Sequence, residues 1–204
     1  MQQTISSTRL RLRKSRNDIP PTTRRRYNRL IHQHLLTSGL FNRGSRIAGY
    51  LAYDGEPSID LIIQRQHKAN RPFYLPALRK QQLTFKAYRF NDTLANNKFN
   101  IPEPTGHQSF NPKYLNTILM PLVGFDGHGN RLGMGGGFYD RTLRFTLPAS
   151  CKKHPLLIGI AYSQQKVNRL LKQPWDIPLD AVITEQGLQC FSIKSLSLLR
   201  PPTR

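Results

Sequence analysis

The sequence has few cysteines, few acidic residues and no long apolar run, and each shortage excludes a class of protein. Its two cysteines, Cys151 and Cys190, lie far apart and match no metal or redox spacing. A disulfide framework is therefore excluded, and a reducing compartment, the cytoplasm, is expected. The longest apolar stretches, around residues 115–125 and 156–162, are too short to span a bilayer, and the basic N-terminus lacks the apolar stretch of a secretory signal.

Acidic residues are outnumbered, with 11 Asp and Glu against 31 Lys and Arg, and the formal charge is +20. Such an excess favours a polyanionic partner such as a nucleic acid or a phosphate-rich ligand. Residues 1–30 alone carry +8, whereas residues 31–140, which hold most of the motifs, carry +5. A basic nucleic-acid-binding protein is one hypothesis. However, no DNA- or RNA-binding signature is present and the aromatic residues do not interleave with the basic runs, so we expect no specific nucleic-acid binding.

The chain does have the means to build a core, because it is 38% hydrophobic and contains 10 Phe and 8 Tyr. Its pattern predicts helices over 4–17, 21–37, 58–70, 137–147 and 164–171, and strands over 46–53, 73–78, 83–90, 117–123, 156–161 and 180–184. Residues 91–116 are expected to be irregular. This alternation predicts one three-layer α/β/α domain with a largely parallel central sheet. Within the domain, residues 1–204, we expect basic helices at 4–37, an α/β core at 46–186 and a C-terminal tail at 187–204.

The strongest local signal is a glycine-rich loop between the strand at 117–123 and the helix that starts near residue 137. Seven glycines fall within residues 124–137. Glycine lets backbone N–H groups approach an anion, and a helix N-terminus favours negative charge, so a phosphate site is expected. The loop matches neither the Walker motif nor the usual dinucleotide fingerprint. Asp126 fits two interpretations, a Mg²⁺ ligand or the residue that closes a turn with Gly127.

The whole string is more specific than its glycines. Phe125-Asp126-x-x-Gly129-x-Arg131-Leu132-Gly133-x-Gly135-x-Gly137-x-Tyr139-Asp140 resembles the signature of the 5-formyltetrahydrofolate cyclo-ligases. Further segments resemble this family in matching order, and the resemblance covers roughly residues 8–186. They are Gly49–Glu56, Phe73–Ala77, Asn100–Pro104 and Asp176–Glu185.

This resemblance implies a Rossmann-like fold of the isomerase and CoA-transferase type. It also implies an ATP- and Mg²⁺-dependent ligase that converts 5-formyltetrahydrofolate to 5,10-methenyltetrahydrofolate by phosphorylating the formyl oxygen. The folate substrate can be polyglutamylated, and we expect the protein to be a monomer. The implied ATP-binding residues are Arg9, Arg13, Lys14, Arg131, Leu132, Gly133, Met134, Gly135, Gly136, Gly137, Phe138 and Tyr139. The implied substrate-binding residues are Leu51, Glu56, Met134, Phe138 and Tyr139, and the implied metal ligands are Asp140 and Asp176. From the residues alone, another phosphate-binding α/β enzyme, such as a sugar-phosphate isomerase, also stays open.

Overall fold

The computed structural model describes residues 4–42, 46–106, 108–147 and 154–199. In these ranges, eight strands form one sheet in the order β12-β11-β10-β7-β1-β2-β3-β6. Its strands are β1 (Ile47–Ala48), β2 (Phe73–Arg79), β3 (Gln82–Tyr88), β6 (Ser109–Phe110), β7 (Thr117–Pro121), β10 (Leu156–Ile160), β11 (Ala181–Thr184) and β12 (Gly187–Cys190). The five inner strands, β11 to β2 in this order, are parallel, and β12, β3 and β6 are antiparallel at the two edges. The predicted α/β class with a mostly parallel sheet is confirmed.

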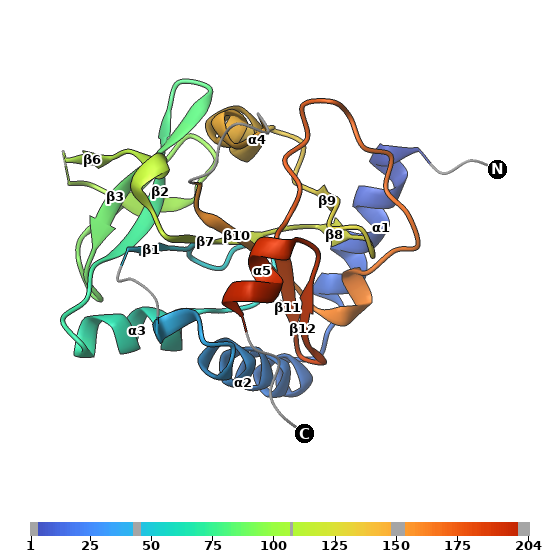
Figure 1. The fold of residues 1–204 in the computed structure, drawn as a ribbon, viewed down its shortest axis with the longest axis horizontal. Coiled ribbons are helices and arrows are strands. Elements are labelled where there is room, and N and C mark those ends of the chain that lie inside the picture. The colour runs from blue at the N-terminus through green and yellow to red at the C-terminus, as the bar shows by residue number, and fades with distance from the viewer. Residues whose placement is uncertain (1–3, 43–45, 107, 148–153, 200–204) are drawn as a thin grey trace.

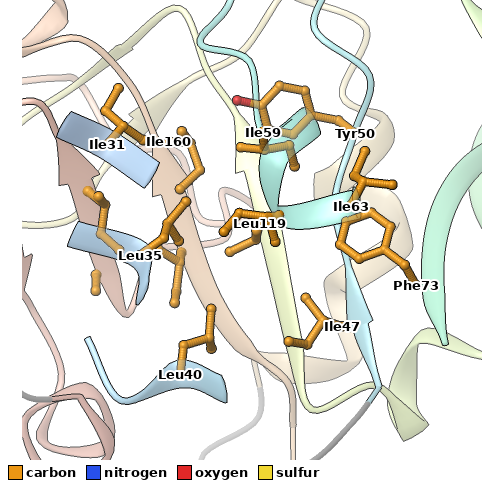
Figure 2. Close-up of a cluster of buried hydrophobic side chains, with 14 of the residues drawn as sticks. Ile31, Leu35, Leu40, Ile47, Tyr50, Ile59, Ile63, Phe73, Leu119 and Ile160 are labelled. Carbon is orange, nitrogen blue, oxygen red and sulfur yellow. The ribbon is translucent and has the colours of Figure 1, made fainter. Parts of the chain in front are cut away.

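Helices pack on both faces of this sheet because its inner strands are apolar on both sides. On one face, Ile31 and Leu35 of α2 (Pro21–Thr37) and Ile63 of α3 (Asp60–Lys68) pack around Leu119 and Ile160. Figure 2 shows this cluster of side chains.

Neighbouring strand residues point to the opposite face. There, Ile118 and Met120 of β7 pack with Leu143 of α4 (Phe138–Leu143). Figure 1 shows α2 and α3 below the sheet and α4 above it. Two layers of helix therefore enclose the sheet, as the sequence pattern predicts.

The remaining helices lie at the ends of the chain. The basic helix α1 (Ile5–Asn17) lies beside the small hairpin of β8 (Gly124–Phe125) and β9 (Arg131–Leu132), as Figure 1 shows. Leu12 of α1 packs against Val123 and Leu132 there. In the segment interpreted as a C-terminal tail, residues 187–190 form β12 and residues 193–198 form α5 (Ile193–Leu198).

Other elements differ in detail from the prediction. The predicted helix at 164–171 is wrong: only a short turn, η4 (Ser163–Gln165), forms there. The backbone donors that a helix would use are engaged elsewhere, because Val167 N donates to Phe125 O (2.8 Å) and Leu170 N to Asp126 Oδ2 (3.0 Å). These bonds hold the segment against residues 125–126, at the start of the glycine-rich loop.

The stretch at 91–116 is more regular than expected. It contains the paired strands β4 (Leu94–Asn96) and β5 (Pro102–Pro104), then β6 and the turn η2 (Pro112–Tyr114). Helix α4 is shorter than expected and continues as the 3₁₀ turn η3 (Arg144–Thr146), and another such turn, η1 (Leu40–Asn42), follows α2. Among the described residues, no helix combines the length and apolar character needed to cross a membrane.

Candidate active site

The candidate site lies beyond the carboxyl ends of the parallel strands, where ligands of open α/β sheets usually bind. The chain leaves β1 after Ala48 and passes through Asp54 and Glu56, and it leaves β7 after Pro121 and enters the glycine-rich loop. Helix α1 covers this edge from the side (Figure 1). Segments far apart in the sequence therefore contribute to one region.

Asp126 holds the first half of the glycine-rich loop. Its carboxylate is fully buried and accepts hydrogen bonds from His128 N (2.9 Å), Asn130 N (3.0 Å), Asn130 Nδ2 (2.9 Å) and Leu170 N (3.0 Å). Burial acts to raise the pKa of Asp126, but these hydrogen bonds outweigh it and hold the pKa below its usual value. These hydrogen bonds occupy both carboxylate oxygens of Asp126. They favour its interpretation as the residue that closes the turn over its interpretation as a Mg²⁺ ligand.

The second half of the loop is exposed and its backbone needs glycine. Gly135 and Gly137 have φ angles of +105° and +60°, a region that residues with a side chain rarely adopt. Arg9 of α1 donates from Nε to Gly133 O (2.9 Å), and a Cβ at Gly135 would lie 3.6 Å from its guanidinium carbon. Arg9 therefore lies directly against the loop, where its charge can act on a bound anion.

Arg131 occupies the centre of the site and is almost fully enclosed. Its side chain is 5% exposed, its Nη2 lies 2.6 Å from Asp140 Oδ1, and its guanidinium lies 5.9 Å from the Tyr139 ring centroid. Burial lowers the pKa of Arg131, whereas the charges of Asp140 and Asp176 act in the opposite direction. Two polar atoms here, Arg131 Nε and the Tyr139 hydroxyl, are buried without a hydrogen-bond partner among the described residues. Such atoms are costly unless a ligand satisfies them.

The charges of both predicted metal ligands act on this arginine. Asp140 Oδ1 accepts from Arg131 and from Ile177 N (3.1 Å), so α4 is joined to the segment that carries Asp176. Asp176 Oδ2 accepts from Gln173 N (2.8 Å). The structure therefore brings together two carboxylates that are far apart in sequence.

Glu56 lies in the segment that follows β1, and its side chain is largely buried. Burial raises its pKa to about 7, although Arg16 and a hydrogen bond from the Tyr53 backbone act in the opposite direction. Its Oε2 accepts from Tyr53 N (3.1 Å), and its charge acts on the Tyr139 hydroxyl. Glu56 therefore titrates near neutral pH, within reach of the aromatic residue at the end of the loop.

The other predicted residues divide into those near the loop and those held elsewhere. Phe138 packs edge-on against Phe99 (5.7 Å between ring centroids), and Met134 is 46% exposed. In contrast, the Leu51 side chain packs against the core, and Lys14 pairs with Asp18 at 2.7 Å instead of reaching the loop.

Arg13 and Leu132 are engaged by neighbouring elements. Arg13 donates to Asp54 Oδ2 (2.8 Å), and Leu132 pairs with Gly124 in the hairpin. Sequence reasoning missed Arg16 and Asp54. The signal for Arg16 was its helical spacing from Arg9 and Arg13, which places all three on one face of α1.

One family of known proteins matches most of the chain. The model of the 5-formyltetrahydrofolate cyclo-ligase family matches residues 2–185. The chain belongs to this family. The prediction of a ligase of folate one-carbon metabolism is therefore confirmed.

Individual relatives of this cyclo-ligase family member cover nearly its whole length. It is 36% identical over 176 residues to the 5-formyltetrahydrofolate cyclo-ligase of Haemophilus influenzae, covering 84% of this chain and 92% of the relative. It is 33% identical over 178 residues to that of Escherichia coli K12, covering 85% and 96%. Among solved structures, the 5,10-methenyltetrahydrofolate synthetase of Aquifex aeolicus matches with a TM-score of 0.80 and 28% identity over 92% of each chain.

Proposed function

We propose that this protein converts 5-formyltetrahydrofolate to 5,10-methenyltetrahydrofolate, using ATP and Mg²⁺ and releasing ADP and phosphate. The observation that carries the proposal is the buried Arg131, which pairs with Asp140, lies over Tyr139 and keeps an unpartnered Nε between a glycine-rich loop and two carboxylates. A cationic group in this setting suits a phosphate, and the membership in the cyclo-ligase family supports the folate substrate.

The ATP phosphates would bind along the loop from Arg131 to Tyr139, with Arg9 and Arg13 approaching from α1. Arg9 already contacts the loop, whereas Arg13 is paired with Asp54 and would have to leave it to bind a phosphate oxygen. The pairing of Lys14 with Asp18 makes Lys14 a weaker member of the predicted set. The positive-φ glycines allow the backbone to approach an anion closely.

The residues present fit Mg²⁺. Asp140 and Asp176 would hold it, and when bound it would neutralise charge on the phosphate oxygens. Among the described residues, no group of three or more His, Cys, Asp or Glu side chains could form a complete protein cage. Two carboxylates suffice for Mg²⁺, since this ion usually keeps water and substrate phosphates as its other ligands. The other carboxylate oxygen of Asp140, Oδ2, makes no hydrogen bond within the described residues, so it is available as a ligand.

The folate would bind on the side of Glu56, Leu51, Met134, Phe138 and Tyr139. The chemistry requires that a poor leaving group be activated. The formyl oxygen attacks the γ-phosphorus, the P–O bond to ADP breaks, and the oxygen then carries the phosphoryl group. The neighbouring folate nitrogen attacks the formyl carbon and loses its proton, and the C–O bond breaks as phosphate leaves. The protein contributes mainly positioning and charge neutralisation to such a transfer.

The test is a spectrophotometric assay of purified protein with ATP, Mg²⁺ and 5-formyltetrahydrofolate. We expect the methenyl product to accumulate with one ADP released per turnover, and omission of ATP or of Mg²⁺ to abolish it. Product formation without ATP, or no product under any of these conditions, would contradict the proposal. The cytoplasmic location and the monomeric state stay predictions from the sequence.

A further inference from the structure

Arg16 of α1 is the largest fully buried side chain among the described residues, and its charge is shared between two carboxylates. Its Nη2 lies 2.8 Å from Asp54 Oδ2, and its Nη1 lies 3.9 Å from Glu56 Oε1. Nη1 also donates to Leu122 O (3.2 Å), at the end of β7. One guanidinium therefore joins the N-terminal helix, the segment after β1 and the segment that leads into the glycine-rich loop.

Asp54 is likewise shared, because it accepts hydrogen bonds from other residues of α1 as well as from Arg16. Its Oδ2 accepts from Arg13 Nε (2.8 Å) as well as from Arg16, and its Oδ1 accepts from Asn17 Nδ2 (3.1 Å). Burial acts to raise the pKa of Asp54, but the bonds from Arg13 and Asn17 and the charge of Arg16 hold it below its usual value. Asp54 is therefore an anion that competes with Glu56 for Arg16.

The charges that face Glu56 come from every element packed around it. Arg16 of α1 stabilises its carboxylate, and Asp54 of its own segment opposes it. The hydroxyls of Tyr50 and Tyr139 also lie within range of its charge, and Tyr50 is fixed by a bond to Pro57 O (2.7 Å). Arg16 is the largest stabilising influence in this set, so its position decides how readily Glu56 ionises.

We propose that Arg16 is a positioning residue, which divides its charge between Asp54 and Glu56 and thereby sets the charge that Glu56 presents to the folate. Neither Arg16 nor Asp54 needs to touch a substrate for this role. The inference rests on the proposed function, since it assigns how the folate side of that site is tuned. It also links the phosphate side of the site to the folate side, because Arg13, a proposed phosphate ligand, donates to the same carboxylate oxygen of Asp54 as Arg16 does.

The test is the pH profile of kcat/KM for 5-formyltetrahydrofolate, measured at saturating ATP and Mg²⁺ over about three pH units centred on neutrality. The wild-type profile should show a step near pH 7. In Arg16→Met the step should move upward by about one pH unit or more, because a cation within about 4 Å is lost. In Asp54→Asn it should move downward, because a competing anion is lost. Arg16→Lys keeps a cation and should return the step toward its wild-type position.

Opposite shifts in the two variants would support the proposal, because a purely structural defect would lower activity without moving the step in both directions. If Arg16→Met does not fold, Asp54→Asn decides alone, since Asp54 lies near the surface. A wild-type profile without a step near pH 7, an unmoved step in Asp54→Asn, or shifts in the same direction would overturn it. An inactive wild-type enzyme would instead contradict the proposed function.

Discussion

Replacing Arg131 with alanine separates its observed ion pair with Asp140 from its proposed contact with phosphate. The substitution removes a cation from a side chain that is 5% exposed and leaves Asp140, 21% exposed, without its partner. Breaking a buried ion pair costs about 3 to 5 kcal/mol, and the water-accessible part of Asp140 favours the lower end. We therefore expect the protein to fold with its melting temperature lowered by about 6 to 12 °C, at about 2 to 4 °C per kcal/mol for a chain of this size.

The effect on activity should be larger than this loss of stability explains. Loss of a cation that meets the transferred phosphate should lower kcat/KM for ATP by about 100-fold or more. The control for stability is the double variant Arg131→Ala with Asp140→Asn, which removes the unpaired charge together with a proposed Mg²⁺ ligand. It should recover much of the melting temperature but none of the activity. Wild-type turnover in Arg131→Ala, or recovery of turnover together with stability in the double variant, would refute the reasoning.

Three further predictions concern other residues of the structure. Burial raises the pKa of Glu56 to about 7, so the folded protein favours its protonated form. The protonated side chain therefore contributes stability that is complete below its ordinary pKa of 4.5 and is lost as the pH rises through about 7. In urea denaturation, the free energy of unfolding of the wild type should therefore fall by about 3 kcal/mol over that pH range relative to that of Glu56→Gln. A difference between the two proteins that stays constant with pH would contradict the raised pKa. Gly129→Ala should destabilise the protein by about 2 kcal/mol or more, since its Cβ would lie 2.9 Å from Leu179 O. Gly187→Ala is the control: its φ is also positive, but a Cβ there would meet open space, so it should cost about 1 kcal/mol. Equal costs for the two variants would argue against the close contact at Gly129. Asp176→Asn, which can keep the hydrogen bond from Gln173 N, should raise the Mg²⁺ concentration for half-maximal rate by about tenfold, the equivalent of about 1.4 kcal/mol. An unchanged Mg²⁺ requirement would exclude Asp176 from the proposed metal site.

The layered core follows directly from the sequence pattern. Continuous apolar runs such as 117–121 and 156–160 are buried on both faces, so they require a sheet with helices on each side. The glycine-rich loop was also predictable, because positive φ angles at Gly135 and Gly137 leave glycine as the natural choice. Both features depend on residues that are adjacent in the chain, so the sequence alone predicts them.

Features that depend on long-range hydrogen bonds were not predictable. The segment at 164–171 has helical composition, but its amides at Val167 and Leu170 bond to the strand and loop of residues 125–126. The burial of Arg16 also depends on distant partners, since its acceptors lie at least 38 residues away in the chain. Its helical spacing from Arg9 and Arg13 places Arg16 on their face of α1, but the charge pattern does not show that the side chain is buried, because a basic face is equally compatible with exposure.

The measurement that most directly tests the central claim follows the formyl oxygen itself. With 5-formyltetrahydrofolate labelled with oxygen-18 in the formyl group, a reaction that phosphorylates this oxygen transfers the label to inorganic phosphate, one labelled phosphate for each methenyl product. We predict full transfer in the wild type, measured by mass spectrometry of the released phosphate. Unlabelled phosphate accompanying product formation would contradict it, because the oxygen would then have left by a route that does not involve the phosphoryl group.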